Sequence, residues 1–355
     1  MEAAIAVLKG DGIGPEIVNE AIKVLNSITA KYGHSFTYTE ASVGAAAIDE
    51  LGDPYPASTH SLCMESDAIL FGAIGDPKYD NDPKAKVRPE QGLLKMRKSL
   101  GLYANIRPVF TFPSLVHKSP IKAEIVSGAD FICVRELTGG IYFGEPRGRS
   151  EDGKKAYDTC VYTVEEIRRV CNLAFDFARM RNKRLTMIDK ANVIATSRLW
   201  RETMQAMEKE NTDVQVDYLL VDNAAMQIIQ NPRRFDVLVT ENLFGDILTD
   251  EASVITGSLG LLPSASIGEH TSLYEPIHGS YPQAAGKDIA NPLATILSAA
   301  MMLEYSFNLR TEANDIKKAV EASIEANYCT EDLNKEQPKH TSEVGTWIAN
   351  YITNH

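Results

Sequence analysis

Short apolar segments alternate along this chain with amphipathic segments, and this alternation constrains the fold more than any other feature of the sequence. Apolar runs of strand length occur at residues 3–8, 68–72, 184–188, 216–221 and 235–240. Helical spacing of apolar residues occurs at residues 15–25, 56–65, 165–179 and 196–208. Strands separated by helices in this way predict an α/β protein in which helices cover both faces of the sheet.

Two polar stretches interrupt the alternation. Residues 76–91 are polar and rich in proline, so we expect a surface loop there. Residues 148–162 combine a polar turn with alternating residues, which predicts a protruding hairpin whose natural partner is a second subunit. The sequence contains neither an internal repeat nor a low-complexity linker, so we expect its two halves to be intertwined.

Charge composition limits the partners that the chain can bind. Its 355 residues include 36 Lys and Arg against 48 Asp and Glu, a formal net charge of −12. This balance excludes a nucleic-acid or anionic-membrane surface, because both need clustered basic side chains. It does not exclude a small anionic substrate, because a local group of arginines can oppose the overall charge.

The cysteines and the N-terminus indicate a reducing compartment. The five cysteines are widely spaced, without a CxxC pair or a zinc-ligand spacing, so we expect free thiols. The first residues, MEAAIAVLKGDG, carry an acid where a signal peptide carries a base. The sequence has no apolar stretch long enough to span a bilayer. We therefore expect a soluble, cytoplasmic protein.

The motif GDGIGP at residues 10–15 suggests a dinucleotide site but does not match one. A Rossmann fingerprint has a glycine where this chain has Pro15, and the G-K-[ST] ending of a phosphate-binding P-loop is also missing. Pro15 suits the first turn of a helix. We therefore interpret the motif as a structural turn between a strand and a helix.

Three arginines stand beside apolar residues. Arg97 lies in LLKMRK, Arg107 precedes a proline in extended backbone, and Arg135 ends the apolar run at residues 131–134. A single arginine in such a setting usually extends its charged group from the core edge into water. Three of them favour bidentate binding of a carboxylate or phosphate.

Three aspartates are candidate metal ligands. Asp246 and Asp250 follow the run at residues 235–240 and are four residues apart, so on a helix they share one face. Acidic residues in the first turns of a helix are also common without any ligand. Asp222, at the end of another apolar run, completes a set of hard oxygen donors. Such a set favours magnesium or manganese over zinc.

Lys190, Tyr142 and His278 are the remaining candidates for chemistry. Lys190 ends a strand run and Tyr142 lies in a glycine-rich turn, and ligands of α/β proteins bind at strand ends. Beside a metal and three arginines they could serve as general acid and base; without these groups, either would be an ordinary surface residue. Positive charge around them is expected to lower both pKa values. His278 lies in EPIHGS, a loop whose backbone amides could hold a phosphate, although a lone histidine is more often structural.

Several motifs along the chain occur in an order that identifies a family. They are GDGIGPEI, LLKMRKS, NIRP, VRELTGGIYFGEPRG, DKANV, NLFGDILTDEAS, GSLGLLPSAS and EPIHGS. In this order, over essentially the whole chain, they resemble the β-decarboxylating dehydrogenases, the family of isopropylmalate and isocitrate dehydrogenases.

The resemblance implies an α/β fold of two domains that share one mixed sheet, which is not a Rossmann fold. Residues 1–102 plus 257–355 would form the first, cofactor-binding domain. Residues 103–256 would form the second domain, with the dimer interface and an arm near residues 148–162.

The resemblance also assigns roles to the charged residues. Arg97, Arg107 and Arg135 match the arginines that hold the substrate carboxylates. The ligands of a divalent ion, Mg²⁺ or Mn²⁺, are matched by Asp222, Asp246 and Asp250.

Two further residues match the acid–base groups of the family. Lys190 matches the residue that helps to deprotonate the substrate hydroxyl, and Tyr142 matches the acid that protonates the enol carbon after carbon dioxide leaves. In the family, Lys190 and Asp222 enter the site from the other subunit. The resemblance therefore implies a homodimer with shared active sites.

NAD is the cofactor that the resemblance implies. NAD-dependent relatives usually have an aspartate where this chain has Gln283, whose amide can pair with ribose hydroxyls but does not repel a 2′-phosphate. The Lys and Tyr of NADP-dependent relatives are missing from the sequence at residues 283–284, so NAD is favoured. The residues expected to bind it are Ile13, Glu275, His278, Gly279, Ser280, Gln283 and Asn291.

The implied reaction is the oxidative decarboxylation of isopropylmalate to 4-methyl-2-oxopentanoate and carbon dioxide in leucine biosynthesis. Leu93, Leu94 and Val193 would form an apolar wall that suits an isopropyl group and leaves a third carboxylate unpaired. Glu90, expected near the nicotinamide, would repel an anionic arm. Isocitrate, homoisocitrate, malate and tartrate are the alternative substrates. A non-catalytic regulatory subunit is the alternative from another class, but it should have lost a metal aspartate, the lysine or the tyrosine.

Overall fold

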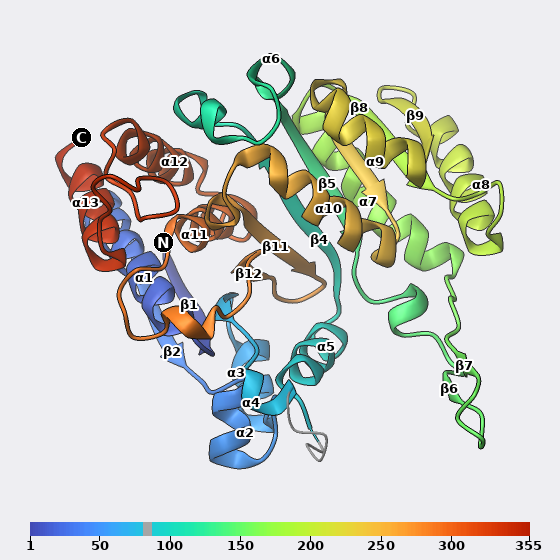
Figure 1. Cartoon of the computed structure of the whole chain (residues 1–355), viewed down its shortest axis with the longest axis horizontal. Coiled ribbons are helices and arrows are strands. Elements are labelled where there is room, and N and C mark those ends of the chain that lie inside the picture. The colour runs from blue at the N-terminus through green and yellow to red at the C-terminus, as the bar shows by residue number, and fades with distance from the viewer. Residues whose placement is uncertain (81–86) are drawn as a thin grey trace. The chain divides into compact units, whose positions relative to one another are not determined.

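The computed structural model of the protein describes residues 1–80 and 87–355. The chain divides into two compact units, which are described separately. Unit 1 comprises Met1–Leu102 and Ser258–His355, and unit 2 comprises Tyr103–Gly257. Figure 1 shows the elements of both in chain order by colour.

Five strands of unit 1 pair in the order β2-β1-β3-β12-β11 within the described residues. The parallel strands are β1 (Glu2–Gly10), β2 (Ser35–Glu40), β3 (Ala68–Ala73) and β12 (Leu273–Pro276), while β11 (Pro263–Gly268) pairs antiparallel with β12. Every residue of β3 is buried, as a continuous apolar run in a parallel sheet requires.

Helices of unit 1 pack on these strands and on one another. The long ones are α1 (Gly14–Tyr32), α11 (Leu293–Tyr305), α12 (Arg310–Glu325) and α13 (Thr341–Asn354). The shorter ones are α2 (Ala45–Leu51), α3 (Ala57–Glu65), α4 (Pro77–Asp80) and α5 (Pro89–Ser99). Helix α1 begins with a proline in its first turn, as predicted from GDGIGP, and ends at Gly33 in the left-handed conformation.

The predicted surface loop at residues 76–91 is wrong at both ends. Asp76 accepts a hydrogen bond from the backbone N–H of Lys78 at 2.9 Å, and α4 follows as one helical turn. Helix α5 begins at Pro89, because Gln91 accepts from the backbone N–H of Arg88 at 2.9 Å in a capping box. Residues 81–86 of the expected loop lie outside the described residues.

Unit 2 carries its strands in the order β4-β5-β10-β8-β9 within the part of the chain that the structure describes. They are β4 (Leu102–Phe110), β5 (Asp130–Glu136), β8 (Arg184–Asp189), β9 (Gln215–Leu220) and β10 (Val237–Thr240). Only the β4–β5 pair among these is antiparallel. The predicted α/β class with mixed strand directions is confirmed.

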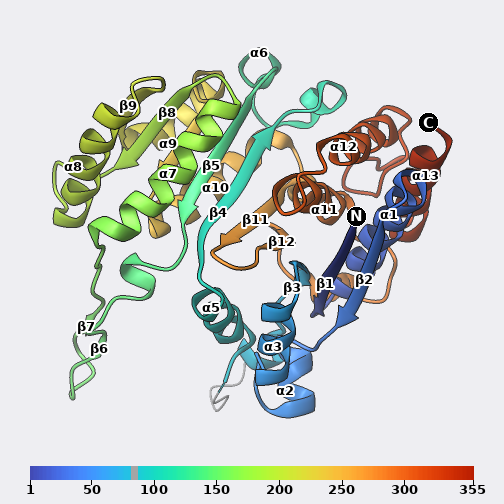
Figure 2. The ribbon, with the colours of Figure 1, turned by 180° about the vertical axis from the view of Figure 1, so that it is seen from behind.

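Helices cover both faces of the unit 2 strands. Figures 1 and 2, which view the molecule from opposite sides, place α7 (Val164–Met180) on one face and α10 (Asn242–Thr256) on the other. The remaining helices are α6 (Ala123–Val126), α8 (Ala195–Glu210) and α9 (Val221–Gln230). Under α10 the core includes Phe131, Leu238, Leu248 and Ile255, all almost fully buried.

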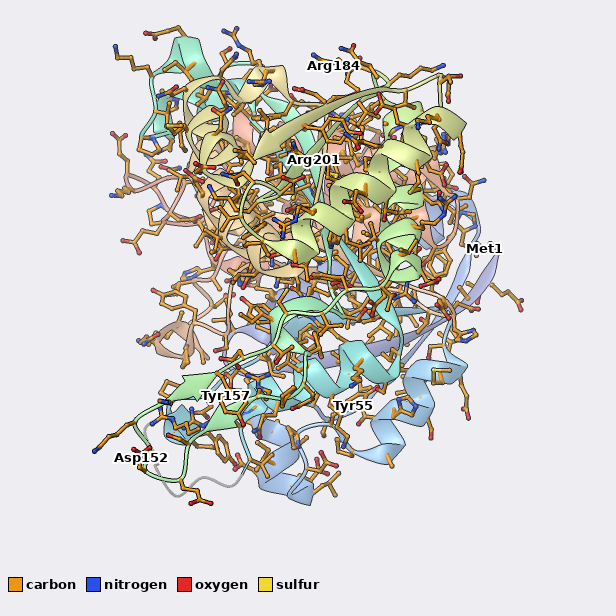
Figure 3. The ribbon with its side chains drawn as sticks, turned by 90° about the vertical axis from the view of Figure 1, so that its right-hand side faces the viewer. Met1, Tyr55, Asp152, Tyr157, Arg184 and Arg201 are labelled. Carbon is orange, nitrogen blue, oxygen red and sulfur yellow. The ribbon has the colours of Figure 1, made fainter. Side chains whose placement is uncertain are left out.

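The predicted hairpin at residues 148–162 is confirmed. Strands β6 (Gly148–Arg149) and β7 (Ala156–Tyr157) pair antiparallel across a polar turn. Figure 3 shows Asp152 and Tyr157 at the end of unit 2 that lies away from Arg184 and Arg201. All five cysteines carry free thiols. The described helices include none that is long and apolar enough to cross a membrane.

Candidate active site

Five of the predicted residues meet in unit 2, and the register of its strands explains why. Arg135 lies near the end of β5, opposite Thr240 at the end of β10. Helix α10 begins two residues after Thr240, so its first turns lie over the end of β5. Asp246 therefore reaches Arg135, and Asp250 follows one turn later on the same face, as predicted.

Arg135, Asp246 and Tyr142 form a connected group. The guanidinium of Arg135, whose side chain is 3% exposed, contacts one carboxylate oxygen of Asp246, and the Tyr142 hydroxyl donates to the other oxygen at 2.8 Å. Burial alone would raise the pKa of Asp246, but the charge of Arg135 and the Tyr142 hydrogen bond outweigh it and hold the pKa below its usual range. Asp246 is therefore ionised at neutral pH.

The expectation that positive charge lowers the pKa of Tyr142 is wrong. Burial, followed by the hydrogen bond to Asp246 and the charge of that carboxylate, raises the pKa to about 12, although Arg135 acts in the opposite direction. The carboxylate lies closer to the phenol than the sequence could indicate. Tyr142 is therefore a proton donor at neutral pH and not a phenolate.

Arg107 is held beside Asp250 by a second set of contacts. Its Nε donates to Asn105 Oδ1 at 2.7 Å, and its Nη1 donates to Thr249 Oγ1 at 2.6 Å and to Asp250 Oδ1 at 3.2 Å. The Arg107 side chain is 10% exposed, whereas that of Asp250 is 70% exposed. The arginine is fixed, and the exposed carboxylate can accept a further ligand.

Lys190 and Asp222 form a separate pair in unit 2. Lys190 directly follows β8, Asp222 lies in the first turn of α9, and Lys190 Nζ is 3.0 Å from Asp222 Oδ1. The hydrogen bond from Lys190 lowers the pKa of Asp222. Val193, three residues after Lys190, is 66% exposed.

The donor set on α10 fits a hard divalent ion. Asp246 and Asp250 offer carboxylate oxygens one helical turn apart, which suits Mg²⁺ or Mn²⁺. Within residues 1–80 and 87–355, however, no three His, Cys, Asp or Glu side chains gather as a metal site. Asp222 is therefore not joined to Asp246 and Asp250 in a single chain, and their common role as metal ligands stays a prediction.

Four predicted substrate residues lie on α5 in unit 1. Glu90, Leu93, Leu94 and Arg97 are spaced so that they share one face of this helix. Arg97 Nη2 donates to Glu275 at 3.3 Å, while its buried Nε has no hydrogen-bond partner in the part of the chain that the structure describes. Leu94 is 38% exposed. An arginine with an unused donor beside leucines can receive an anion that carries an apolar arm.

A cavity of about 670 Å³ lies in unit 1. Among the predicted cofactor residues, Ile13, His278, Gly279 and Asn291 line it. Sequence reasoning missed Ser258, Leu259, Gly260, Tyr281, Ile289, Ala290, Glu331, Asp332 and Lys335, which also line it.

The other three predicted cofactor residues lie outside the lining of this cavity in the described chain. Ser280 supports it, because its carbonyl accepts from the backbone N–H of Ile13 at 2.8 Å. Glu275 pairs with Arg97, and Gln283 is exposed in a short turn at Pro282–Ala284.

The glycine motif at residues 10–15 brings two chain segments together at this cavity. Gly12 has φ 58°, and a Cβ there would overlap the backbone oxygen of Ser280. The predicted turn between a strand and a helix is therefore present, between β1 and α1. The close approach also explains how Ile13 reaches the cavity wall although the fingerprint does not match.

Two polar side chains in the cavity wall suit a hydrogen-bonding ligand. His278 Nδ1 donates to the Gly279 carbonyl at 3.0 Å, so its buried and unpartnered Nε2 is an acceptor. Burial also lowers the pKa of His278 and keeps it neutral. Asp332 accepts from Ser258 Oγ at 2.6 Å and from Asn291 Nδ2 at 2.9 Å, which ties three chain segments together.

Comparison with known proteins shows the family to which the chain belongs. A profile of the family described as "Isocitrate/isopropylmalate dehydrogenase" matches residues 4–348, so the chain belongs to the isocitrate/isopropylmalate dehydrogenase family. It is 58% identical over 354 residues, 99% of both chains, to "3-isopropylmalate dehydrogenase" of Bacteroides fragilis (strain YCH46). It is also 54% identical to the protein of that name in Aquifex aeolicus (strain VF5), over 94% of this chain and 92% of that one. Among solved structures, isocitrate dehydrogenase from Methylococcus capsulatus matches with a TM-score of 0.88 and 34% identity over 99% of both chains.

Proposed function

We propose that the protein is an NAD-dependent, divalent-metal-dependent dehydrogenase that oxidises and decarboxylates 3-isopropylmalate, the acid in the name "3-isopropylmalate dehydrogenase" that its relatives carry. The observation that carries the proposal is the group formed in unit 2 by Arg107, Arg135, Tyr142, Asp246 and Asp250. It combines fixed cations for carboxylates, carboxylate oxygens for a metal and a protonated phenol in one place.

The proposal includes two bound groups whose residues are present. Asp246 and Asp250 would hold the metal ion, with Asp222 of a second copy of this chain. The cavity of unit 1 would hold NAD through Ile13, His278, Gly279 and Asn291, together with Glu275, Ser280 and Gln283 nearby. The cofactor would accept hydride from the carbinol carbon, which becomes a ketone. The metal would polarise the ketone oxygen and so assist loss of the neighbouring carboxylate as carbon dioxide.

The residues of the chain would carry out the remaining steps. Arg97, Arg107 and Arg135 would bind the substrate carboxylates, because guanidinium groups match their planar geometry. Lys190 would take up the proton of the substrate hydroxyl. Tyr142, protonated at neutral pH, would deliver a proton to the carbon from which carbon dioxide departs.

A homodimer follows from the same proposal. Asp222 and Lys190 are paired with each other and do not join the Asp246 group within one described chain, so a complete site needs a second copy. Large apolar side chains on the outer faces of α9 and α10 support such an interface: Met226 is 53% exposed, Ile247 60% and Val254 44%. Sedimentation at micromolar concentration should show a dimer, and a monomer with full activity would contradict the shared site.

Leu93, Leu94 and Val193 support isopropylmalate as the substrate. An apolar wall gains by burying an isopropyl group and would leave the third carboxylate of isocitrate or homoisocitrate unpaired. Glu90, which lies on α5 with Leu93 and Leu94, would repel the third carboxylate. Malate and tartrate have no apolar group that could pack against these side chains.

The direct test of the proposal is NADH formation from 3-isopropylmalate by the purified protein. Formation should require Mn²⁺ or Mg²⁺, stop on chelation with EDTA and return when the metal is restored. Exchange of NAD for NADP should lower kcat/KM. A non-catalytic regulatory subunit would give no turnover with any 2-hydroxy acid, even though Tyr142, Lys190 and the three aspartates are all present.

A further inference from the structure

Asn242, the first residue of α10, contacts two parts of the candidate site at once. Its side chain is buried, with the residue 1% exposed. Its Oδ1 accepts from Arg135 Nε at 3.1 Å and from Arg135 Nη2 at 2.8 Å. Its Nδ2 donates to the Gly139 carbonyl at 3.2 Å. One amide therefore touches both the arginine and the segment that leads to Tyr142.

The segment from Thr138 to Tyr142 is held on its other side by Glu136. This carboxylate accepts from the backbone N–H of Thr138 at 2.8 Å and from that of Gly139 at 2.9 Å. Glu136 thus holds the N–H of Gly139, while Asn242 holds its C=O. The chain then turns at Gly140, with φ 73°, into the short helical turn that ends at Tyr142.

Tyr162 connects Glu136 and Asn242 beneath this segment. Its hydroxyl accepts from the backbone N–H of Asn242 at 3.0 Å and donates to Glu136 at 3.3 Å. The ring is buried edge-on against Trp200, with centroids 5.3 Å apart. A Cβ at Gly140 would overlap the Tyr162 hydroxyl, so the segment packs directly on this ring. The backbone N–H of Asn242 and the side chains of Tyr162 and Glu136 therefore form one connected support beneath the segment.

We propose that Asn242 is a positioning residue that fixes the Tyr142 segment and the Arg135 guanidinium in one geometry, so that the proton donor and the carboxylate-binding cation stay aligned. The proposal rests on the proposed function for the roles of Arg135 and Tyr142. Its structural part does not depend on those roles. The amide oxygen accepts from Arg135, whereas the amide nitrogen donates to the Tyr142 segment at Gly139. A substitution that keeps the oxygen and removes the nitrogen therefore separates the two contacts.

Asn242→Asp and Asn242→Ala separate them. Aspartate keeps an oxygen for Arg135, whose charge compensates the new carboxylate, but it cannot donate to the Gly139 carbonyl at neutral pH. Alanine removes both contacts. Both variants keep the backbone N–H that donates to Tyr162, and thermal unfolding shows whether each variant is folded before other measurements are made.

Hydrogen–deuterium exchange of the full chain tests the structural part without any activity. Loss of one buried hydrogen bond should speed exchange of the amides at residues 138–144 by about threefold to tenfold in both variants, with no change in peptides of unit 1. Unchanged exchange at residues 138–144 in both folded variants would overturn the proposal.

Steady-state kinetics with isopropylmalate test the functional part. Asn242→Asp should lower kcat by about tenfold to a hundredfold while KM stays within about threefold, because Arg135 is still held. The solvent deuterium isotope effect on kcat should rise, since proton delivery becomes slower. Asn242→Ala should lower kcat and also raise KM. Equal changes in both variants would mean that the amide only packs, and absence of wild-type turnover with altered exchange would reject the proposed function alone.

Discussion

Replacement of Tyr142 by phenylalanine tests the assignment of the proton donor. The substitution removes one hydroxyl and leaves the ring, so Asp246 loses the hydrogen bond of 2.8 Å but keeps its contact with Arg135. The wild-type phenol, with a pKa raised to about 12 by burial and by Asp246, is protonated throughout the neutral range. Phenylalanine has no proton to deliver at any pH.

The expected effect on catalysis is larger than the effect on stability. General acid catalysis typically contributes about 10²- to 10⁴-fold, which is about 3 to 5 kcal/mol of activation free energy. The lost hydrogen bond to a partly exposed carboxylate should cost only about 1 kcal/mol of folding free energy. KM for isopropylmalate should stay within about threefold, because Arg107 and Arg135 are untouched.

The assay compares the overall reaction with one partial reaction, reduction of the 2-keto intermediate, in the same variant. Overall NADH formation from isopropylmalate should fall by the full factor, whereas reduction of the 2-keto intermediate by NADH should fall much less, since it needs no proton on carbon. Tyr218→Phe is a matched control, because Tyr218 also donates to a carboxylate, that of Glu208 at 2.8 Å. Equal losses in the overall reaction and in reduction of the intermediate, or activity in Tyr142→Phe equal to that of the control, would show that Tyr142 is not the proton donor.

Three other substitutions have defined outcomes. Asp246→Asn should lower metal-dependent turnover by at least about 10³-fold and abolish saturation by Mn²⁺, and wild-type saturation would remove the metal assignment. Gln283→Asp should tighten NAD and weaken NADP in fluorescence titrations, and unchanged affinities would count against a ribose contact at this position. Burial and repulsion from Glu136 raise the pKa of Glu241 to about 7. Between about pH 4.5 and about pH 7 the folded chain therefore keeps a proton on Glu241 that the unfolded chain has released. The free energy of unfolding falls as pH rises through this range. Glu241→Gln should therefore stabilise the protein by roughly 2 to 3 kcal/mol more at about pH 8 than at about pH 4 in urea unfolding, and a pH-independent difference would contradict the shifted pKa.

Local patterns in the sequence were sufficient to predict much of unit 2. The run at residues 235–240 predicts a strand, and the spacing of Asp246 and Asp250 predicts their common face on the helix that follows. These features depend on the helical and extended repeats alone, which are properties of neighbouring residues. The hairpin at residues 148–162 was predictable for the same reason.

The contacts of the site could not be predicted from local pattern, because they depend on strand order. Arg135 meets Asp246 since β10 pairs in parallel with β5, although the two residues are 111 positions apart. Burial and another long-range contact, the hydrogen bond from Tyr142 to Asp246, raise the pKa of Tyr142, which the sequence alone predicted in the wrong direction. Asn242 gave no signal beyond its place in a motif.

The wall of the unit 1 cavity shows a second limit. Glu331, Asp332 and Lys335 lie in an irregular segment between α12 and α13. In such a segment the spacing of side chains does not predict which of them face the protein. Asp332 reaches Ser258 and Asn291 only because that segment folds back over the cavity. Residues of this kind become visible only once the fold brings the segments together.

The proposed reaction is best tested by comparing kcat/KM of the purified protein across 2-hydroxy acids with Mn²⁺ and NAD. We expect NADH and carbon dioxide from 3-isopropylmalate, with kcat/KM at least about a hundredfold above that for isocitrate, homoisocitrate, malate or tartrate. Turnover of one of these acids without turnover of 3-isopropylmalate would contradict the proposed substrate. Absence of turnover with every acid in the presence of metal and NAD would contradict catalysis itself.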